Sequence, residues 1–191
     1  NIKSEGSTGD NLTGMSRSRN TYDFQDSQDL NGCIWGMNVK NSYDAGPGIG
    51  DSDGPIYDSI DMLGNSNALF SAVTYHCLDI QYSINCHGCS HIFGCYGLRN
   101  KKYCILNLQY TKEEYEELKD YIIKELTDLG VHGLMMPPEI APFAYNETIA
   151  QDNMPLTKEE AIAQGFRWED DIQMTKGRET LKPEDIPDHI N

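Results

Sequence analysis

The chain is short of basic residues and has no long apolar run, and both shortages limit what it can bind. It carries 15 Lys and Arg residues against 30 Asp and Glu residues, for a formal net charge of −15. Phosphate backbones are bound by clustered Lys and Arg, so this composition argues against nucleic acid as a partner. No run of about 18 consecutive apolar residues occurs, so we predict no membrane span.

Sequence motifs of several common enzymes are also missing. We find neither Gly-x-Ser-x-Gly nor a phosphate-binding glycine loop. Cys-x-x-Cys occurs once, without the βαβ pattern that a thioredoxin-like redox site requires. The sequence therefore does not establish an enzyme, and it favours a protein without catalytic activity.

Cysteines in a regular spacing are the most informative feature that is present. Cys77, Cys86, Cys95 and Cys104 follow one another at nine-residue intervals, and Cys89 lies three residues after Cys86. In nine-residue blocks counted from residue 59, small residues hold the first position throughout. The segments around Cys33 and Cys95 also resemble one another. Internal similarity of this kind predicts a repeat architecture.

Short alternating runs between Asn and Gly residues are typical of strands and turns. We therefore predict a mainly β fold, a parallel β-solenoid (β-helix) over residues 21–110. Each coil would contain two blocks, about 18 residues, and the absence of a hexapeptide pattern favours right-handed winding. Coils stack about 4.8 Å apart, which would put Cys77 over Cys95 and Cys86 over Cys104.

The flanking regions differ from the repeats in composition. Residues 1–20 are polar, and we predict a flexible N-terminal segment. Residues 111–130 begin with a Thr-Lys-Glu-Glu capping box and carry apolar residues at helical spacing, which predicts an α-helix that caps the open solenoid end. Residues 131–191 are proline-rich and predict an extended segment with a short helix at 158–164 and a polar tail.

The cysteines allow three chemistries. Packed thiols in a narrow core are the interpretation we favour, because free Cys is among the most buried residue types. A zinc site is the second, because Cys-x-x-Cys binds as a bidentate thiolate pair; its candidate ligands are Cys86, Cys89, Cys95, Cys104, His87 and His91. Disulfides Cys77–Cys95 and Cys86–Cys104 are the third, since stacked coils lie within disulfide reach. Reduced thiols would favour a cytoplasmic location, but the sequence does not identify the compartment.

Several short segments resemble an uncharacterised family of Cys-rich repeat proteins from uncultured bacteria with small genomes. They fall in order between residues 86 and 168, at 94–95, 97–101, 103–107, 110–115, 141–143, 145–148, 150–151, 155–161 and 165–168. Members of that family look like central Cys-rich repeats flanked by zinc-ribbon-type clusters. Because this chain lacks both flanking clusters, the resemblance implies a fragment of a longer protein.

We therefore expect a non-catalytic β-solenoid scaffold or protein-interaction module that binds a protein partner or associates with itself. A zinc-binding protein built on the Cys86-x-x-Cys89 cluster is one alternative. A carbohydrate-binding or carbohydrate-active β-helix is another, by analogy with solenoids that carry polysaccharide sites. An enzyme of that kind needs paired carboxylates, and the candidates Asp58, Asp61 and Asp79 are scattered along the sequence.

Overall fold

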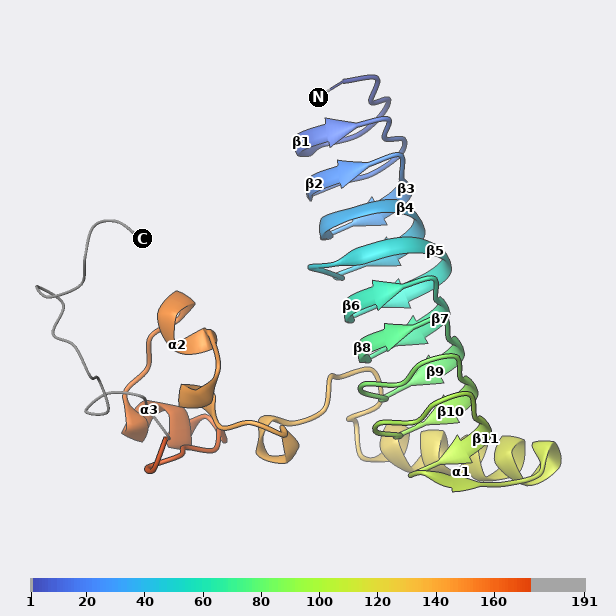
Figure 1. Ribbon diagram of the computed structural model, residues 1–191, viewed down its shortest axis with the longest axis vertical. Helices are drawn as coiled ribbons and strands as arrows, with labels where there is room; N and C mark the ends of the chain where they lie inside the picture. The colour runs from blue at the N-terminus through green and yellow to red at the C-terminus, as the bar shows by residue number, and fades with distance from the viewer. Residues whose placement is uncertain (1, 173–191) are drawn as a thin grey trace, which may run out of the picture. The chain divides into compact units, whose positions relative to one another are not determined.

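The computed structural model describes residues 2–172, and its main body is a parallel β-solenoid of about eight turns (Figure 1). This confirms the predicted fold class. The strands, in chain order, are β1 (Gly9–Thr13), β2 (Thr21–Gln25), β3 (Gln28–Asn31), β4 (Ile34–Tyr43), β5 (Ile49–Tyr57), β6 (Ile60–Leu63), β7 (Ser66–Leu69), β8 (Ala72–Tyr75), β9 (Leu78–Gln81), β10 (Ser90–Phe93), β11 (Lys102–Ile105) and β12 (Leu108–Gln109).

The coil length differs from the prediction. Ile80 pairs in register with Ile92, and Ile92 with Cys104, so one turn of the solenoid takes 12 residues. Between β4 and β5 the spacing is 13 residues from Gly36/Ile49 to Lys40/Asp53, and a register shift raises it to 14 at Ser42/Ile56. The predicted coil of about 18 residues is therefore wrong.

A three-residue unit explains both the true period and the error. Every third side chain points into the interior, as at Cys86, Cys89, Ile92 and Cys95. The residue before nearly every such buried residue has a positive φ, which Asn, Asp and Gly adopt at least cost. Both the nine-residue spacing of the cysteines and the 12-residue coil are multiples of this unit, so the cysteine spacing alone does not identify the coil.

Buried hydroxyls and thiols support the coils from within. The Ser83 amide donates to the Ser71 hydroxyl one coil earlier, over 3.1 Å, and the Cys95 amide donates to the Ser83 hydroxyl over the same distance. The Cys89 amide approaches the Cys77 sulfur in the same way, at 3.4 Å. Polar atoms in the narrow interior thus have partners, as buried polar groups require.

The solenoid starts earlier than predicted. The Ile2 amide donates to the Leu12 carbonyl over 2.8 Å, and Glu5 forms a parallel bridge with Ser16. Leu12 and Met15 are buried at the three-residue spacing. Residues 2–20 therefore belong to the stacked coils, and the prediction of a flexible segment at 1–20 is wrong for these residues.

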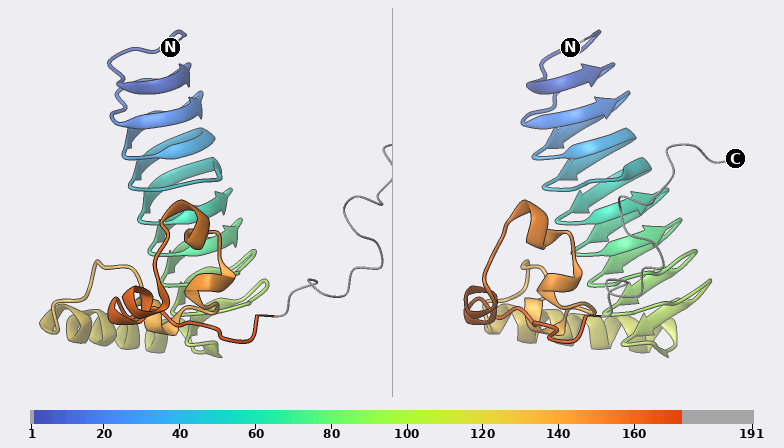
Figure 2. Two further views of the ribbon diagram at one scale, coloured as in Figure 1. Left: turned by 90° about the vertical axis from the view of Figure 1, so that its left-hand side faces the viewer. Right: turned by 60° about the vertical axis from the view of Figure 1, so that its left-hand side comes forward.

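Helix α1 (Lys112–Asp128) lies across the C-terminal end of the stack, as both views in Figure 2 show. Thr111 and Glu114 form the predicted capping box, and Tyr115 is buried in a cluster with Phe93 and Ile105. The Asn107 amide group adds a second cap, because it donates to the Tyr96 carbonyl and accepts from the Tyr96 amide, both at 2.9 Å. One side chain thus replaces the backbone of a further coil.

The chain divides into two compact units, Asn1–Met136 and Pro137–Asn191. The second contains the short helices η1 (Pro138–Ile140), η2 (Tyr145–Glu147), α2 (Ala150–Asn153) and α3 (Lys158–Ala163), the last at the predicted place. Residues 173–191, most of the predicted polar tail, lie outside the described residues. Within the described part, no helix has the length and apolarity that crossing a membrane demands.

Candidate binding face

All six cysteines are buried as free thiols, as the packed-thiol interpretation expects. Cys77 stacks in register on Cys89, whereas Cys95 lies in the column of Ser83 and Cys104 in that of Ile92. The stacking argument for disulfides Cys77–Cys95 and Cys86–Cys104 is therefore wrong, because it depended on the longer coil.

Burial disfavours the thiolate form of five of these cysteines. Desolvation, the largest cause, raises the pKa of both Cys77 and Cys95 to about 11. It raises the pKa of Cys33, Cys86 and Cys104 in the same direction. The thiolate is the nucleophilic and metal-binding form, so the interior keeps the sulfurs in their inert state near neutral pH.

The predicted zinc ligands do not converge. The ring of His87 contacts the Tyr75 ring at a tilt on the outside of the coil, with centroids 4.7 Å apart. His91 lies on another face, stacked on Tyr103 and 3.2 Å from an Asp79 oxygen. Cys86, Cys89, Cys95 and Cys104 point into the interior instead. Over residues 2–172, no group of three or more His, Cys, Asp or Glu side chains is placed to hold a metal ion.

The carboxylates considered for glycoside hydrolysis take part in separate local contacts. Asp61 accepts a hydrogen bond from the Tyr75 hydroxyl at 2.9 Å. Asp79 accepts from Asn67 and lies beside His91. Burial, with a smaller contribution from the charge of Asp44, raises the pKa of Asp58. Asp61 and Asp79 are thus each held by polar side chains of neighbouring coils.

One lateral side of the solenoid carries exposed apolar side chains that nothing in its own unit covers. We call it the Trp35 face. Its residues come from β2, β4 and β6, and they are Tyr22, Ile34, Trp35, Met37, Ile60 and Leu63. Trp35 is 61% exposed and Met37 is 53% exposed. Single exposed apolar residues are common, but a contiguous group of them marks a binding surface.

A recess of about 330 Å³ divides this face. Its floor is the backbone of Gly48 and Gly50, and we call it the glycine slot. Met37, Gly50 and Leu63 are paired in register on three successive coils. Trp35 and Met37 therefore form one wall and Asp61 and Leu63 the other, because the coil between them has no side chains to place there.

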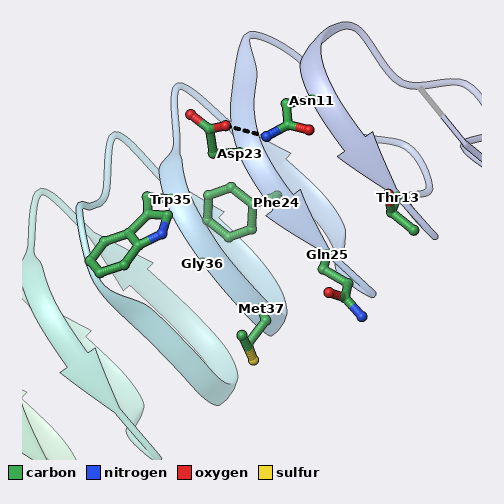
Figure 3. Close-up of a pocket in the computed structure, with 8 residues that line it drawn as sticks. All are labelled: Asn11, Thr13, Asp23, Phe24, Gln25, Trp35, Gly36 and Met37. Carbon is green, nitrogen blue, oxygen red and sulfur yellow. Dashed lines mark hydrogen bonds between the residues drawn. The ribbon is translucent and has the colours of Figure 1, made fainter.

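A second recess, of about 280 Å³, lies on the other side of Trp35 (Figure 3). We call it the polar recess, because Asn11, Thr13, Asp23 and Gln25 line much of it. Asn11 donates to the Asp23 carboxylate across neighbouring coils. A buried Phe24 ring lies beneath. Position 36 requires glycine, because a Cβ there would clash with the Ile49 carbonyl oxygen and come within 2.6 Å of a Phe24 ring carbon. Trp35 thus separates an apolar recess from a polar one.

The sequence reasoning overlooked the Trp35 face because it concentrated on the cysteines. A usable signal was present: Ile34, Trp35 and Met37 form an apolar cluster inside an otherwise polar region, followed by four glycines in residues 46–54. The coil length decides which glycines lie next to Trp35. The cysteine spacing had led us to predict the wrong coil length, so the sequence did not identify these glycines.

No protein-family model, no curated protein and no solved structure matches this chain. The resemblance to Cys-rich repeat proteins thus stays a prediction, and function is argued from geometry.

Proposed function

We propose that the chain is a non-catalytic interaction module that binds a protein partner through the Trp35 face. The observation that carries this proposal is the group of exposed apolar side chains around Trp35, interrupted by a recess with a backbone floor. The buried thiols and the carboxylates tied into local contacts support a binding role over catalysis. We do not advance zinc binding, because the candidate ligands point to different sides of the coil wall.

The backbone at Trp35 adds support. Its φ is +58°, in the left-handed region that costs a bulky residue roughly 1–2 kcal/mol. Phe70 has a similar φ, but its ring packs between Tyr57 and Tyr82, which offsets the cost. Trp35 has no such ring contact among the described residues and remains exposed. The repeat imposes this φ, so what supports a function here is that a bulky residue occupies the position without a packing gain.

Carbohydrate binding is a second candidate, and the polar recess is the observation that favours it. A sugar ring could stack on Trp35 while Asn11, Asp23 and Gln25 bond its hydroxyls. Two substitutions distinguish the two candidate functions. Gln25→Ala would weaken sugar binding, whereas Leu63→Ser would weaken binding of an apolar protein surface.

Photocrosslinking tests the main candidate. A photoreactive amino acid is placed at Met37, and at exposed Asp120 on α1 as the matched control. In extract of the source cells we expect a discrete protein adduct from position 37, absent from position 120 and lost on Trp35→Ser. An adduct with a second copy of the chain would support self-association through this face. Equal labelling from both positions, or none from position 37, would contradict the proposal.

A further inference from the structure

The glycine slot is as wide as one coil, because the middle one of three successive coils has glycines where the other two have side chains. The two coils that form its walls are separated by two coil spacings, about 10 Å between backbones. The coil between them contributes Gly48 and Gly50, so the floor is backbone. At about 330 Å³ the slot is at the small end of ligand pockets. It therefore has room for a single flat side chain.

The walls favour an aromatic ring. Trp35 offers an exposed indole and Met37 a thioether on one side, and Leu63 faces them on the other. Sulfur–aromatic contacts and offset ring stacking both stabilise an aromatic guest beyond its apolar area. A branched aliphatic side chain would gain neither of these contacts.

The rim carries a negative charge. Asp61 Oδ2 accepts from the Tyr75 hydroxyl, whereas Oδ1 faces the floor, 3.5 Å from where a Cβ of Gly48 would lie. With a net charge of −15, the chain also attracts cations at long range. A basic group beside the aromatic ring would therefore find its counter-charge at Asp61.

We propose that the glycine slot holds an aromatic side chain of a partner polypeptide, with an adjacent Lys or Arg bound by Asp61. This inference rests on the proposed interaction function and names the kind of segment that the Trp35 face recognises. The ring enters between Met37 and Leu63, and the peptide backbone runs across the face above Gly50.

Short synthetic peptides test the proposal directly. The probe is an acetylated and amidated Ser-Gly-Trp-Lys-Gly-Ser, and binding is followed by NMR of the Met37 and Leu63 methyl groups. We expect saturable shifts at both methyls. A peptide with Ala in place of Trp should give none, and one with Glu in place of Lys should bind about fivefold more weakly. Asp61→Asn should reduce the preference for Lys over Glu.

Filling the slot is the decisive control. The φ of Gly50 is not in the left-handed region, and a Cβ there would lie 3.1 Å from the flexible end of Leu63. Gly50→Leu should therefore complete the layer, abolish peptide shifts and leave the unfolding midpoint equal to or above that of the wild type. Leu78→Ala, on another exposed position, should change neither.

The outcomes separate this inference from the proposed function. If Gly50→Leu unfolds the chain, Leu63→Ser removes a wall without adding bulk and should still weaken peptide binding. Equal binding of the Trp and Ala peptides, or unchanged binding by Gly50→Leu, would overturn the aromatic slot. A partner adduct at position 37 would still stand in that case, so the interaction module and the slot can fail independently.

Discussion

Two aromatic regions of the solenoid are built on the same three-residue repeat, but one is covered by α1 and the other is exposed. Ring contacts on successive coils link Tyr57, Phe70, Tyr82 and Phe93, with centroids 4.9–5.4 Å apart and edge-on, stacked and tilted geometries in turn. The α1 cluster includes Tyr82 and Phe93, and the Gly133 amide donates to the Tyr82 hydroxyl. The Trp35 face has neither a continuous row of ring contacts nor a cover from its own unit. The two regions therefore differ mainly in what covers them. The rings covered by α1 belong to the core, whereas the uncovered side chains form the candidate site.

The largest expected effect is the protection of the buried cysteines from alkylation. These cysteines lie in the interior, beneath both aromatic regions. Because burial raises the pKa of Cys77 and Cys95 to about 11, we expect alkylation at pH 8 to be slower by a factor of at least about 100 than in the unfolded chain. Mass spectrometry after timed iodoacetamide treatment measures it, with denatured protein as the control. Rapid labelling of either cysteine in the native chain would contradict a closed interior.

Truncating one ring in each region sharpens the comparison. Phe93→Ala should lower the free energy of unfolding by about 3 kcal/mol, because it leaves a cavity under α1. Trp35→Ala should change it by less than about 0.5 kcal/mol, since Trp35 is exposed. Urea unfolding measures both. Similar losses for the two variants would mean that the Trp35 face is part of the core.

The C-terminal cap should contribute less than the core. Asn107→Gly keeps a residue suited to φ +67° but removes both hydrogen bonds to Tyr96. We expect a loss of about 1–2 kcal/mol in unfolding free energy. Asn100→Gly is the matched control, because Asn100 also has a positive φ and none of the described side-chain hydrogen bonds involves it. Equal effects would show that the amide bonds of Asn107 contribute nothing.

The smallest effect should be a pH dependence at α1. Hydrogen bonds from the Thr111 amide and hydroxyl lower the pKa of Glu114 below its ordinary value. A lowered folded-state pKa stabilises the fold above the unfolded pKa, and that stability is lost as the pH falls through the folded pKa. Glu114→Gln should therefore flatten the acid limb of a pH–stability curve below about pH 4.5. Glu117→Gln is the control: among the described residues Glu117 has neither a cap role nor an ion pair, so the curve should stay unchanged.

Much of the fold could be predicted from local signals. Strand–turn alternation indicated the solenoid, and the capping box at Thr111 indicated α1, because cap geometry depends on residues three positions apart. The N-terminal coils were missed because their outward positions are polar. Only Leu12 and Met15, spaced three apart, showed the buried side.

The sequence by itself determined the repeat, the buried small residues and the helix that closes the stack, since each follows from a local pattern. Tertiary structure decided the coil length, and with it every neighbour relation, because spacings of nine and 12 fit the same three-residue unit. Cys77 therefore lies on Cys89 instead of Cys95. For the same reason Gly50 lies between Met37 and Leu63, and the slot exists only once the coils are stacked.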